Sequence, residues 1–517
     1  MSRGFSVRRE RLLIAGAAAV ALAVGLASLS PAPVGVFWDD GVYVITAKAL
    51  ATGHGYRFIH LPGAPAATHY PPLWPILLSI VWRIMPAFPD NVRWMKLLNP
   101  VLLGAGAAGA TLLAIRVARI PRWLAASIVA ATVIVAPMLL LSAVLMSEPL
   151  CLALAAPARA SATLVVLRGR TRDALVAGVL AGLAILARSA AIVLLPGLAI
   201  GLLWHRSRRA SAVALATALV LTVPWFAWSA AHAHELGPSL IGSYGPYATW
   251  VVDGYRDNLA LLPAVIARNA ATMFREAGIV VFSALPRAAR SPLLAILLGF
   301  TVAGLWWAGR RVMPLVSVMV AYLVLTLVWP YAPGRFTWTF FSLYAIVAAA
   351  AVSALVRRAR TRRGWRIPAA AAMGVSFLAL ASVVRYDAVG FRAGWQRLAV
   401  EANAGHIAES VGAIARLTAP TDTVATDVNL TAYLYADRIS VPTSMLTVAE
   451  YLQPKSDAEV RAEFAAIDAA FHPRWWIATG LVRERFALAA WVADTAHHLR
   501  VVAHLPNGGL AARAERR

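Results

Sequence analysis

Two adjacent carboxylates, Asp39 and Asp40, are the residues of this chain best suited to acid–base chemistry. They stand in Phe-Trp-Asp-Asp-Gly-Val-Tyr, residues 37–43, shortly after the first long apolar run. Adjacent carboxylates repel each other, and partial burial among aromatic residues raises the pKa of at least one of them. Such a group can act as a general base or hold a divalent cation. The alternative is a solvated pair of loop residues.

A second polar segment, residues 68–75, reads Thr-His-Tyr-Pro-Pro-Leu-Trp-Pro and leads into the apolar run 76–84. The double proline favours an extended backbone before a short helix. That helix is too short to cross a membrane, so we expect it to lie in the membrane interface. On residue types alone, a plain loop and a surface helix explain this segment most simply.

Glu148 lies between two apolar runs, in Met-Ser-Glu-Pro, residues 146–149. An ionisable group in such a neighbourhood is costly and usually functional. The alternative is a carboxylate that complements the dipole at the start of a helix, with proline in the first turn.

Two arginines lie on the predicted outer side of the membrane, where the positive-inside rule does not explain them. Arg188 separates two short apolar runs, and Arg335 lies in Gly-Arg-Phe at the outer end of a later run. A guanidinium can bind a phosphate through two parallel hydrogen bonds. The alternatives are an ion pair with Glu148 or a contact with a lipid headgroup. Together with the carboxylates, these arginines map to one face and suit an anionic, lipid-linked substrate.

The elements that must position these groups are apolar helices. Of the 517 residues, 60% are hydrophobic and 14% are charged, whereas soluble proteins have about 45–50% and about 25%. The net charge of +24 does not indicate nucleic acid, because the basic residues form short clusters between apolar runs. Runs long enough to cross a membrane predict an α-helical polytopic protein with about eleven transmembrane helices. They lie at residues 12–30, 97–115, 123–141, 148–166, 174–188, 190–204, 211–231, 292–309, 312–330, 338–356 and 367–384.

The positive-inside rule orients these runs with the N-terminus in the cytoplasm. Every loop then assigned to the cytoplasm is basic, and the clusters include Arg116, Arg119, Arg122, Arg168, Arg170, Arg172, Arg206, Arg208, Arg209, Arg310, Arg311 and the arginines of 357–366. The C-terminus is predicted outside. The first run has features of a signal peptide, but its length favours an uncleaved anchor.

Three long segments are predicted outside the cytoplasm, at about residues 31–96, 232–291 and 385–517. The last is rich in Asp and Glu and lacks a run of spanning length. We therefore predict two domains, a transmembrane catalytic domain at 1–384 and a small soluble α/β domain at 385–517. Within the latter, Val424–Thr426, Trp475–Ala478 and Leu499–Ala503 are predicted strands, and Val482–Ala493 is a predicted helix.

The chain resembles the GT-C superfamily of polyprenyl-phosphate-sugar-dependent glycosyltransferases. It is most similar to the branch of protein O-mannosyltransferases, lipid A aminoarabinose transferases and Rgt-type bacterial enzymes. The matching motifs, in order, are Asp39-Asp40-x-x-Tyr43, Ala47–Tyr56, Tyr70-Pro71-Pro72-Leu73, Ser147-Glu148-Pro149, Ala181–Arg188, Gly334-Arg335-Phe336 and Tyr433–Arg438. Their order and sidedness make the set fairly specific.

The resemblance implies a bacterial inner-membrane enzyme that moves a sugar from a polyprenyl phosphate, such as undecaprenyl phosphate, to an acceptor outside the cytoplasm. In that reaction Asp39 is the expected general base, Asp40 would orient either Asp39 or the acceptor, and Arg188 and Arg335 would stabilise the leaving phosphate. Substrate-binding residues would be Tyr43, His69, Tyr70, Glu148, Arg188 and Arg335. No metal site or cofactor is implied with certainty, although Asp39 and Asp40 could hold a divalent cation.

The chain departs from the family at several points, one of them the second acidic residue, which is Asp40 rather than Glu. Related enzymes often have lysine before Pro-Pro where this chain has Tyr70, so His69 is a candidate for sharing phosphate binding there. The tail does not match the β-trefoil of eukaryotic O-mannosyltransferases, so the resemblance does not imply that the acceptor is a protein. The rival interpretation is a transporter or flippase of polyprenyl-linked glycans. Transporters usually show internal repeats and midplane sites, and neither is visible here.

Overall fold

The computed structural model describes residues 2–204, 208–309, 312–479, 484–494, 499–505 and 508–515. The chain forms two compact units, and each combines segments that are far apart in the sequence. The first unit, which we call the helical bundle, comprises Met1–Leu29, Lys96–Pro224 and Val265–Arg397. The second, which we call the mixed unit, comprises Ser30–Met95, Trp225–Ala264 and Leu398–Arg517.

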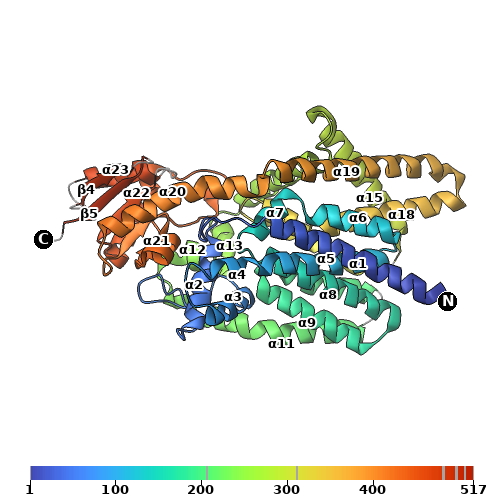
Figure 1. Ribbon diagram of the computed structural model, residues 1–517, viewed down its shortest axis with the longest axis horizontal. Coiled ribbons are helices and arrows are strands. Elements are labelled where there is room, and N and C mark those ends of the chain that lie inside the picture. Colours follow the sequence, from blue (N-terminus) through green and yellow to red (C-terminus); the bar gives the residue numbers. More distant parts are fainter. Residues whose placement is uncertain are drawn as a thin grey trace. The chain divides into compact units, whose positions relative to one another are not determined.

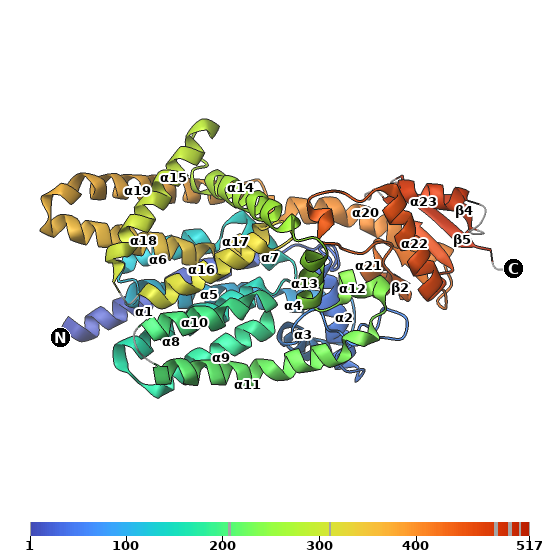
Figure 2. The ribbon, with the colours of Figure 1, turned by 180° about the vertical axis from the view of Figure 1, so that it is seen from behind.

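The bundle is built from long apolar helices (Figures 1 and 2). Neighbouring pairs include α1 with α5, α5 with α8, α8 with α9, and α15 with α18. Its main helices are α1 (Ser2–Ala27), α5 (Leu98–Arg116), α6 (Arg122–Val133), α7 (Ala136–Ala143), α8 (Glu148–Arg168), α9 (Thr171–Ala187), α10 (Leu194–Trp204), α11 (Arg208–His232), α14 (Leu261–Val281), α15 (Arg287–Ala308), α16 (Met313–Val328), α17 (Gly334–Thr339), α18 (Phe341–Thr361) and α19 (Arg366–Arg392). Helix α11 continues into the mixed unit.

Glycines allow some of these helices to approach closely. A Cβ atom at Gly178 of α9 would lie 2.4 Å from the carbonyl oxygen of Ala214 in α11. A Cβ atom at Gly304 of α15 would lie 2.3 Å from the carbonyl oxygen of Ala351 in α18. Small residues are typical of such contacts because apolar lipid gives little hydrophobic drive for helices to associate, so close packing has to supply the attraction.

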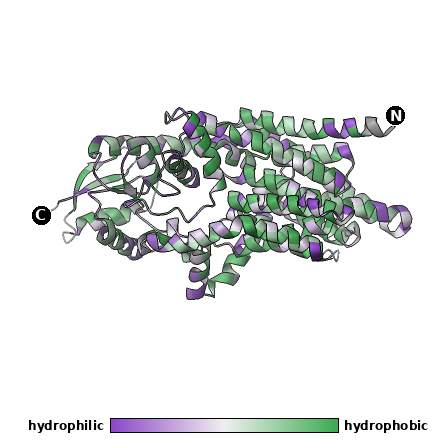
Figure 3. Cartoon of the chain, turned by 90° about the horizontal axis from the view of Figure 1, so that it is seen from below, coloured by the Kyte–Doolittle hydropathy of each residue, from purple (hydrophilic) through white to green (hydrophobic). Residues whose placement is uncertain are grey.

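Within the described residues, each of the eleven apolar runs is mostly helical, and the run 123–141 is divided between α6 and α7. In the part of the chain that the structure describes, six helices are long and apolar enough to cross a membrane, or seven if α6 and α7, which meet at 61°, form one broken span. Hydrophobic residues run along much of the bundle helices (Figure 3). The sequence predicted about eleven spans, which is more than the length and composition of these helices identify. Arg206, Arg310 and Arg311 lie outside the described residues.

The mixed unit combines the outer segments of the chain with its tail. Its helices include α2 (Asp39–Ala51), α3 (Leu73–Ile84), α12 (Ile241–Tyr244), α13 (Tyr247–Asp257), α21 (Asn429–Ala436), α22 (Asp457–Phe471) and α23 (Glu484–Ala493), with α20 (Trp395–Leu417) entering from the bundle. Helix α3 confirms the short apolar helix after the double proline. The predicted start of α23 at Val482 lies outside the described residues.

A five-stranded sheet completes this unit, with strand order β2-β1-β3-β5-β4. The strands are β1 (Val424–Thr426), β2 (Ser440–Val441), β3 (Trp475–Ala478), β4 (Leu499–His504) and β5 (Leu510–Ala514). Strand β1 pairs in parallel with β2 and β3, whereas β5 runs antiparallel to β3 and β4. Buried side chains of α20 and the sheet, among them Ile414, Val424 and Trp475, form its core. The predicted strands β1, β3 and β4 are confirmed.

Candidate active site

The acidic pair begins helix α2 after a strained turn. Trp38 has φ 60° and ψ −68°, and the backbone N–H of Asp39 donates to the carbonyl oxygen of Phe37 at 2.6 Å. This is a γ-turn with positive φ, a rare conformation. Backbone strain of this kind costs about 1–3 kcal/mol and concentrates at functional sites.

Asp40 stabilises that turn from within the protein. It is fully buried, and its carboxylate accepts hydrogen bonds from the backbone N–H of Gly35 at 2.9 Å and of Phe37 at 3.1 Å. Burial raises the pKa of Asp40 to about 6, although these backbone bonds favour the charged form. Asp40 therefore holds the backbone that presents Asp39.

This pKa predicts a measurable pH dependence of stability. The pKa of Asp40 is about 6 in the folded state against 3.8 for an exposed carboxyl, so folding takes up a proton between those values. Relative to Asp40→Asn, the wild type should therefore lose about 3 kcal/mol of stability as the pH rises from about 4 to 6. Melting curves of both proteins from pH 4 to pH 7 measure this difference. A constant difference across the range would contradict the assignment.

Asp39 lies among aromatic side chains from three places in the sequence. Its charge acts on His69 and on Tyr70. The ring of Tyr70 lies 4.8 Å from that of Tyr43 and 5.8 Å from that of Tyr247. The structure therefore brings the predicted residues Asp39, Tyr43, His69 and Tyr70 together. It adds Tyr247, which the sequence analysis did not identify because nothing near that residue marks it out.

The imidazole of His69 is held in one orientation. Its Nδ1 lies 2.5 Å from the carbonyl oxygen of Gly245, which can only accept, so Nδ1 carries the hydrogen. Its ring also lies 4.0 Å from that of Tyr247. Burial lowers the pKa of His69, partly offset by the Gly245 carbonyl and by Asp39. In the neutral ring, Nε2 is then a hydrogen-bond acceptor.

The tail of the chain supports the segment that precedes the acidic pair. The backbone N–H of Val34 donates to the hydroxyl of Tyr435 at 2.9 Å. Gly35 has φ +93°, and a Cβ atom there would lie 2.6 Å from Cγ2 of Thr431. Only glycine suits this position, where α21 meets the backbone that Asp40 holds.

A polar chain joins the three segments of the mixed unit. The hydroxyl of Tyr244 lies 2.9 Å from Nε2 of His60 and accepts a 2.7 Å hydrogen bond from Asn429 Nδ2. The backbone N–H of Ser440 also donates to the carbonyl oxygen of His60 at 2.9 Å. The outer segments and the tail thus share one buried network.

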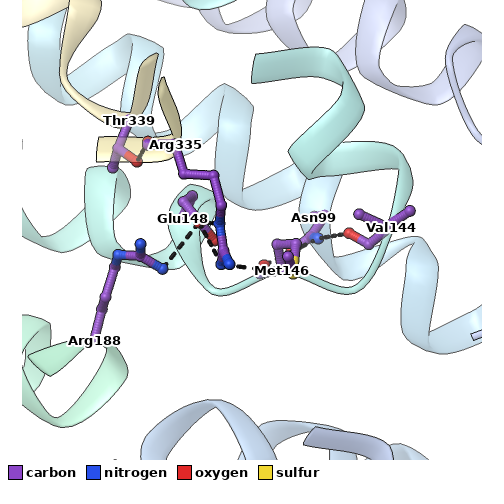
Figure 4. Close-up of polar contacts among 7 residues, drawn as sticks. All are labelled: Asn99, Val144, Met146, Glu148, Arg188, Arg335 and Thr339. Carbon is purple, nitrogen blue, oxygen red and sulfur yellow. Dashed lines mark hydrogen bonds and ion pairs between the residues drawn. The ribbon is translucent and has the colours of Figure 1, made fainter. Parts of the chain in front are cut away.

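The second cluster of predicted residues belongs to the bundle. Glu148 begins α8 and is fully buried. Its Oε1 accepts from Nε and Nη2 of Arg335 at 3.1 and 3.0 Å and lies 2.9 Å from Nη1 of Arg188 (Figure 4). The ion pair, offered above as the alternative for either arginine, is present for both.

The surrounding backbone orients this cluster. Asn99 of α5 donates to the carbonyl oxygens of Val144 and Met146 at 3.0 and 3.2 Å, which fixes the turn before Glu148 (Figure 4). Arg188 directly follows α9, and its guanidinium lies 5.2 Å from the ring centre of Phe336. Two guanidiniums share one carboxylate, so the cluster keeps a net positive charge that suits an anion.

The predicted residues therefore form two groups. Asp39, Asp40, Tyr43, His69 and Tyr70 belong to the mixed unit, and Glu148, Arg188 and Arg335 belong to the bundle. Within the described residues, no three His, Cys, Asp or Glu side chains are arranged to hold a metal ion. Both oxygens of Asp40 already accept backbone hydrogen bonds, which disfavours the two-carboxylate cation site.

No protein-family model matches the chain, and neither does any curated protein. Solved structures do match. Over 100% of both chains, the fold is similar to that of ArnT from Cupriavidus metallidurans bound to undecaprenyl phosphate, with a TM-score of 0.54 at 15% identity. The chain has the GT-C fold.

A second GT-C fold supports the assignment. The apo oligosaccharyltransferase from Archaeoglobus fulgidus matches 98% of this chain and 74% of its own, with a TM-score of 0.56 at 13% identity. Its complex with an inhibitory peptide and a dolichol-phosphate gives a TM-score of 0.54 at 12% identity, over 99% of this chain and 75% of its own. The family resemblance predicted from the motifs is thereby confirmed at the level of the fold.

Proposed function

We propose that this protein is a membrane glycosyltransferase that moves a sugar from a polyprenyl-phosphate donor to an acceptor outside the cytoplasm. The observation that carries the proposal is the GT-C fold, shared along its whole length with a protein bound to undecaprenyl phosphate. The acceptor is a glycan, a lipid or a protein. The transporter alternative has no support from the comparisons.

Arg188 and Arg335 are the residues that we propose bind the lipid phosphate. The leaving phosphate gains charge in the transition state, and preorganised guanidiniums stabilise that charge. The Glu148 carboxylate holds both guanidiniums at one place before the donor arrives. In this role Glu148 positions the two arginines.

Asp39 is the proposed general base. An acceptor hydroxyl ionises far above neutral pH, so a positioned carboxylate must take its proton as it attacks the anomeric carbon. The new bond joins the acceptor oxygen to the sugar, and the bond from the sugar to the lipid phosphate breaks. Tyr43, His69 and Tyr70 would bind the substrates beside Asp39, and Asp40 would position it.

An apolar groove of the bundle suits the prenyl chain. It lies between α9 and α11, has a volume of about 380 Å³ and is lined by Val179, Leu183, Ala216, Thr217, Val220 and Leu221. The same helix, α9, ends at Ala187, directly before Arg188. A chain in this groove would thus lie along the helix that carries a proposed phosphate ligand.

The test is transfer by the purified protein. With a polyprenyl-phosphate sugar and a membrane extract as the source of acceptor, the protein should release polyprenyl phosphate and label the acceptor. Release of the lipid phosphate is followed by thin-layer chromatography. Movement of the donor between the leaflets of vesicles without release would instead identify a flippase.

A conservative substitution tests the phosphate ligands. Arg335→Lys keeps the charge but loses the planar fork of donors. One charge-assisted hydrogen bond contributes about 1.5–3 kcal/mol, so the affinity for the donor should fall at least about tenfold. Binding of a labelled polyprenyl phosphate measures it. If Arg335→Lys and Arg188→Lys both retain the wild-type affinity, neither arginine binds the phosphate.

The proposed topology has about eleven spans, a cytoplasmic N-terminus, a catalytic domain at 1–384 and an extracytoplasmic domain at 385–517 in the plasma membrane. A reporter that is active only outside the cytoplasm should be active after Arg517 and silent after Arg363, because every loop assigned inside is basic. Alkaline phosphatase fusions provide the measurement. The reverse pattern would place Asp39 and Asp40 in the cytoplasm and overturn the proposal.

A further inference from the structure

A polar hollow lies at the end of the bundle where α5 ends and α6 begins. It has a volume of about 520 Å³ and is lined by Glu10, Ile115, Arg116, Arg119, Ile120, Pro121 and Arg122. We call it the basic hollow. It takes no part in the reaction proposed above.

The charges around the basic hollow do not balance. Glu10 accepts from Nε of Arg116 at 2.7 Å and lies 3.9 Å from Nε of Arg122. Arg119 lines the same hollow and lies close enough to Arg357 of α18 for the two charges to repel. Two guanidiniums therefore share the Glu10 carboxylate, and Arg119, which lines the same hollow, has no hydrogen-bond or ion-pair partner among the described residues. Such an excess of positive charge favours an anion.

The backbone at Arg119 is in a conformation that glycine suits better. Its φ is +54°, in the left-handed region that disfavours residues with a Cβ atom. Arginine at this position therefore costs backbone strain that glycine would avoid. Strained residues of this kind are more common at ligand sites than elsewhere.

The neighbouring surface indicates that the anion belongs to a lipid. Trp123 directly follows Arg122 and is 65% exposed, and tryptophan is enriched where membranes meet water. Leu12 of α1, close in sequence to Glu10, is 63% exposed. An exposed indole and an exposed aliphatic side chain beside a cationic hollow suit a phosphodiester headgroup with acyl chains attached.

We propose that the basic hollow is a binding site for the phosphodiester headgroup of an anionic membrane phospholipid. The guanidiniums of Arg119 and Arg357 would bind the phosphate oxygens, and those of Arg116 and Arg122 would keep their ion pairs with Glu10. The bound headgroup would relieve the repulsion between Arg119 and Arg357.

The test uses the full-length protein in detergent, with phosphatidylglycerol or phosphatidylcholine added at equal mole fraction. Phosphatidylglycerol should raise the melting temperature of the wild type, and native mass spectrometry should show it retained. In the double variant Arg119→Gln/Arg357→Gln, the apparent affinity for phosphatidylglycerol should fall at least about tenfold.

A matched control removes the same charge elsewhere. Arg168 and Arg170 flank the turn between α8 and α9 and are exposed, and Arg168→Gln/Arg170→Gln should respond to phosphatidylglycerol as the wild type does. If the double variant folds poorly, Arg119→Gly provides a second test. Because glycine relieves the backbone, this variant should melt no lower than the wild type in phosphatidylcholine, yet respond less to phosphatidylglycerol.

Three results would overturn the proposal. An unchanged response in both the double variant and Arg119→Gly would remove the hollow as the site. An equal loss in the control would show general attraction of a basic protein to an anionic micelle. Equal stabilisation by inorganic phosphate at the same concentration would identify a soluble anion as the ligand and exclude a lipid.

Discussion

Asp39→Asn is expected to reduce sugar transfer at least about a hundredfold, the lower limit of general-base catalysis. The amide has nearly the same shape as the carboxylate but cannot take the acceptor proton. The carboxylate of Asp40 holds the turn through the backbone N–H groups of Gly35 and Phe37, and these bonds remain in the variant, so the fold should persist. Transfer rates at saturating donor, with membrane expression and melting temperature measured alongside, provide the test.

A control in the same unit separates chemistry from charge. Asp90 is exposed, and Asp90→Asn changes the net charge equally, so its transfer rate should match that of the wild type. Near-full activity in Asp39→Asn would remove Asp39 from the mechanism. Loss of the protein from the membrane would instead assign Asp39 a role in folding.

Glu148→Gln is expected to lower the stability of the unliganded protein by about 3–5 kcal/mol, the usual effect of removing one partner of a buried ion pair. The substitution leaves two guanidiniums, those of Arg188 and Arg335, without the carboxylate that they share. If a lipid phosphate binds them, it supplies the missing negative charge. Undecaprenyl phosphate should therefore raise the melting temperature of Glu148→Gln more than that of the wild type.

This second response distinguishes a ligand site from a structural ion pair. In a structural pair, Glu148→Gln would melt lower with and without undecaprenyl phosphate, and the lipid would stabilise both proteins equally. Asp173→Asn is the control, because Asp173 lies in the first turn of α9, at the opposite end from Arg188. Its response to the lipid should equal that of the wild type.

The sequence predicted best what depends on local composition. Apolar runs marked the bundle helices, and β-branched and aromatic residues marked β1 and β3. Strand β5 was missed because Leu-Ala-Ala-Arg-Ala has the composition of a helix, and its pairing with β3 depends on contacts far along the chain. The bend between α6 and α7 was missed because the apolar pattern continues across it.

The candidate site was predictable as a set of residues, but its arrangement was not. Motif order identified Asp39, Glu148 and Arg335. Nothing local could show that Asp40 binds the backbone of its own turn, or that Tyr247 lies beside His69. Likewise, the sequence allowed either a phosphate or Glu148 as the partner of Arg335, and only the distances in the structure reveal the ion pair.

The hydrogen bond from Val34 to Tyr435 has a consequence for the folding of the protein during its synthesis. The two residues are 401 positions apart, so a ribosome must add those residues after Val34 before this contact can form. Until then, the backbone before the acidic pair lacks its partner from α21. A nascent chain that has not yet reached α21 therefore carries Asp39 without this support.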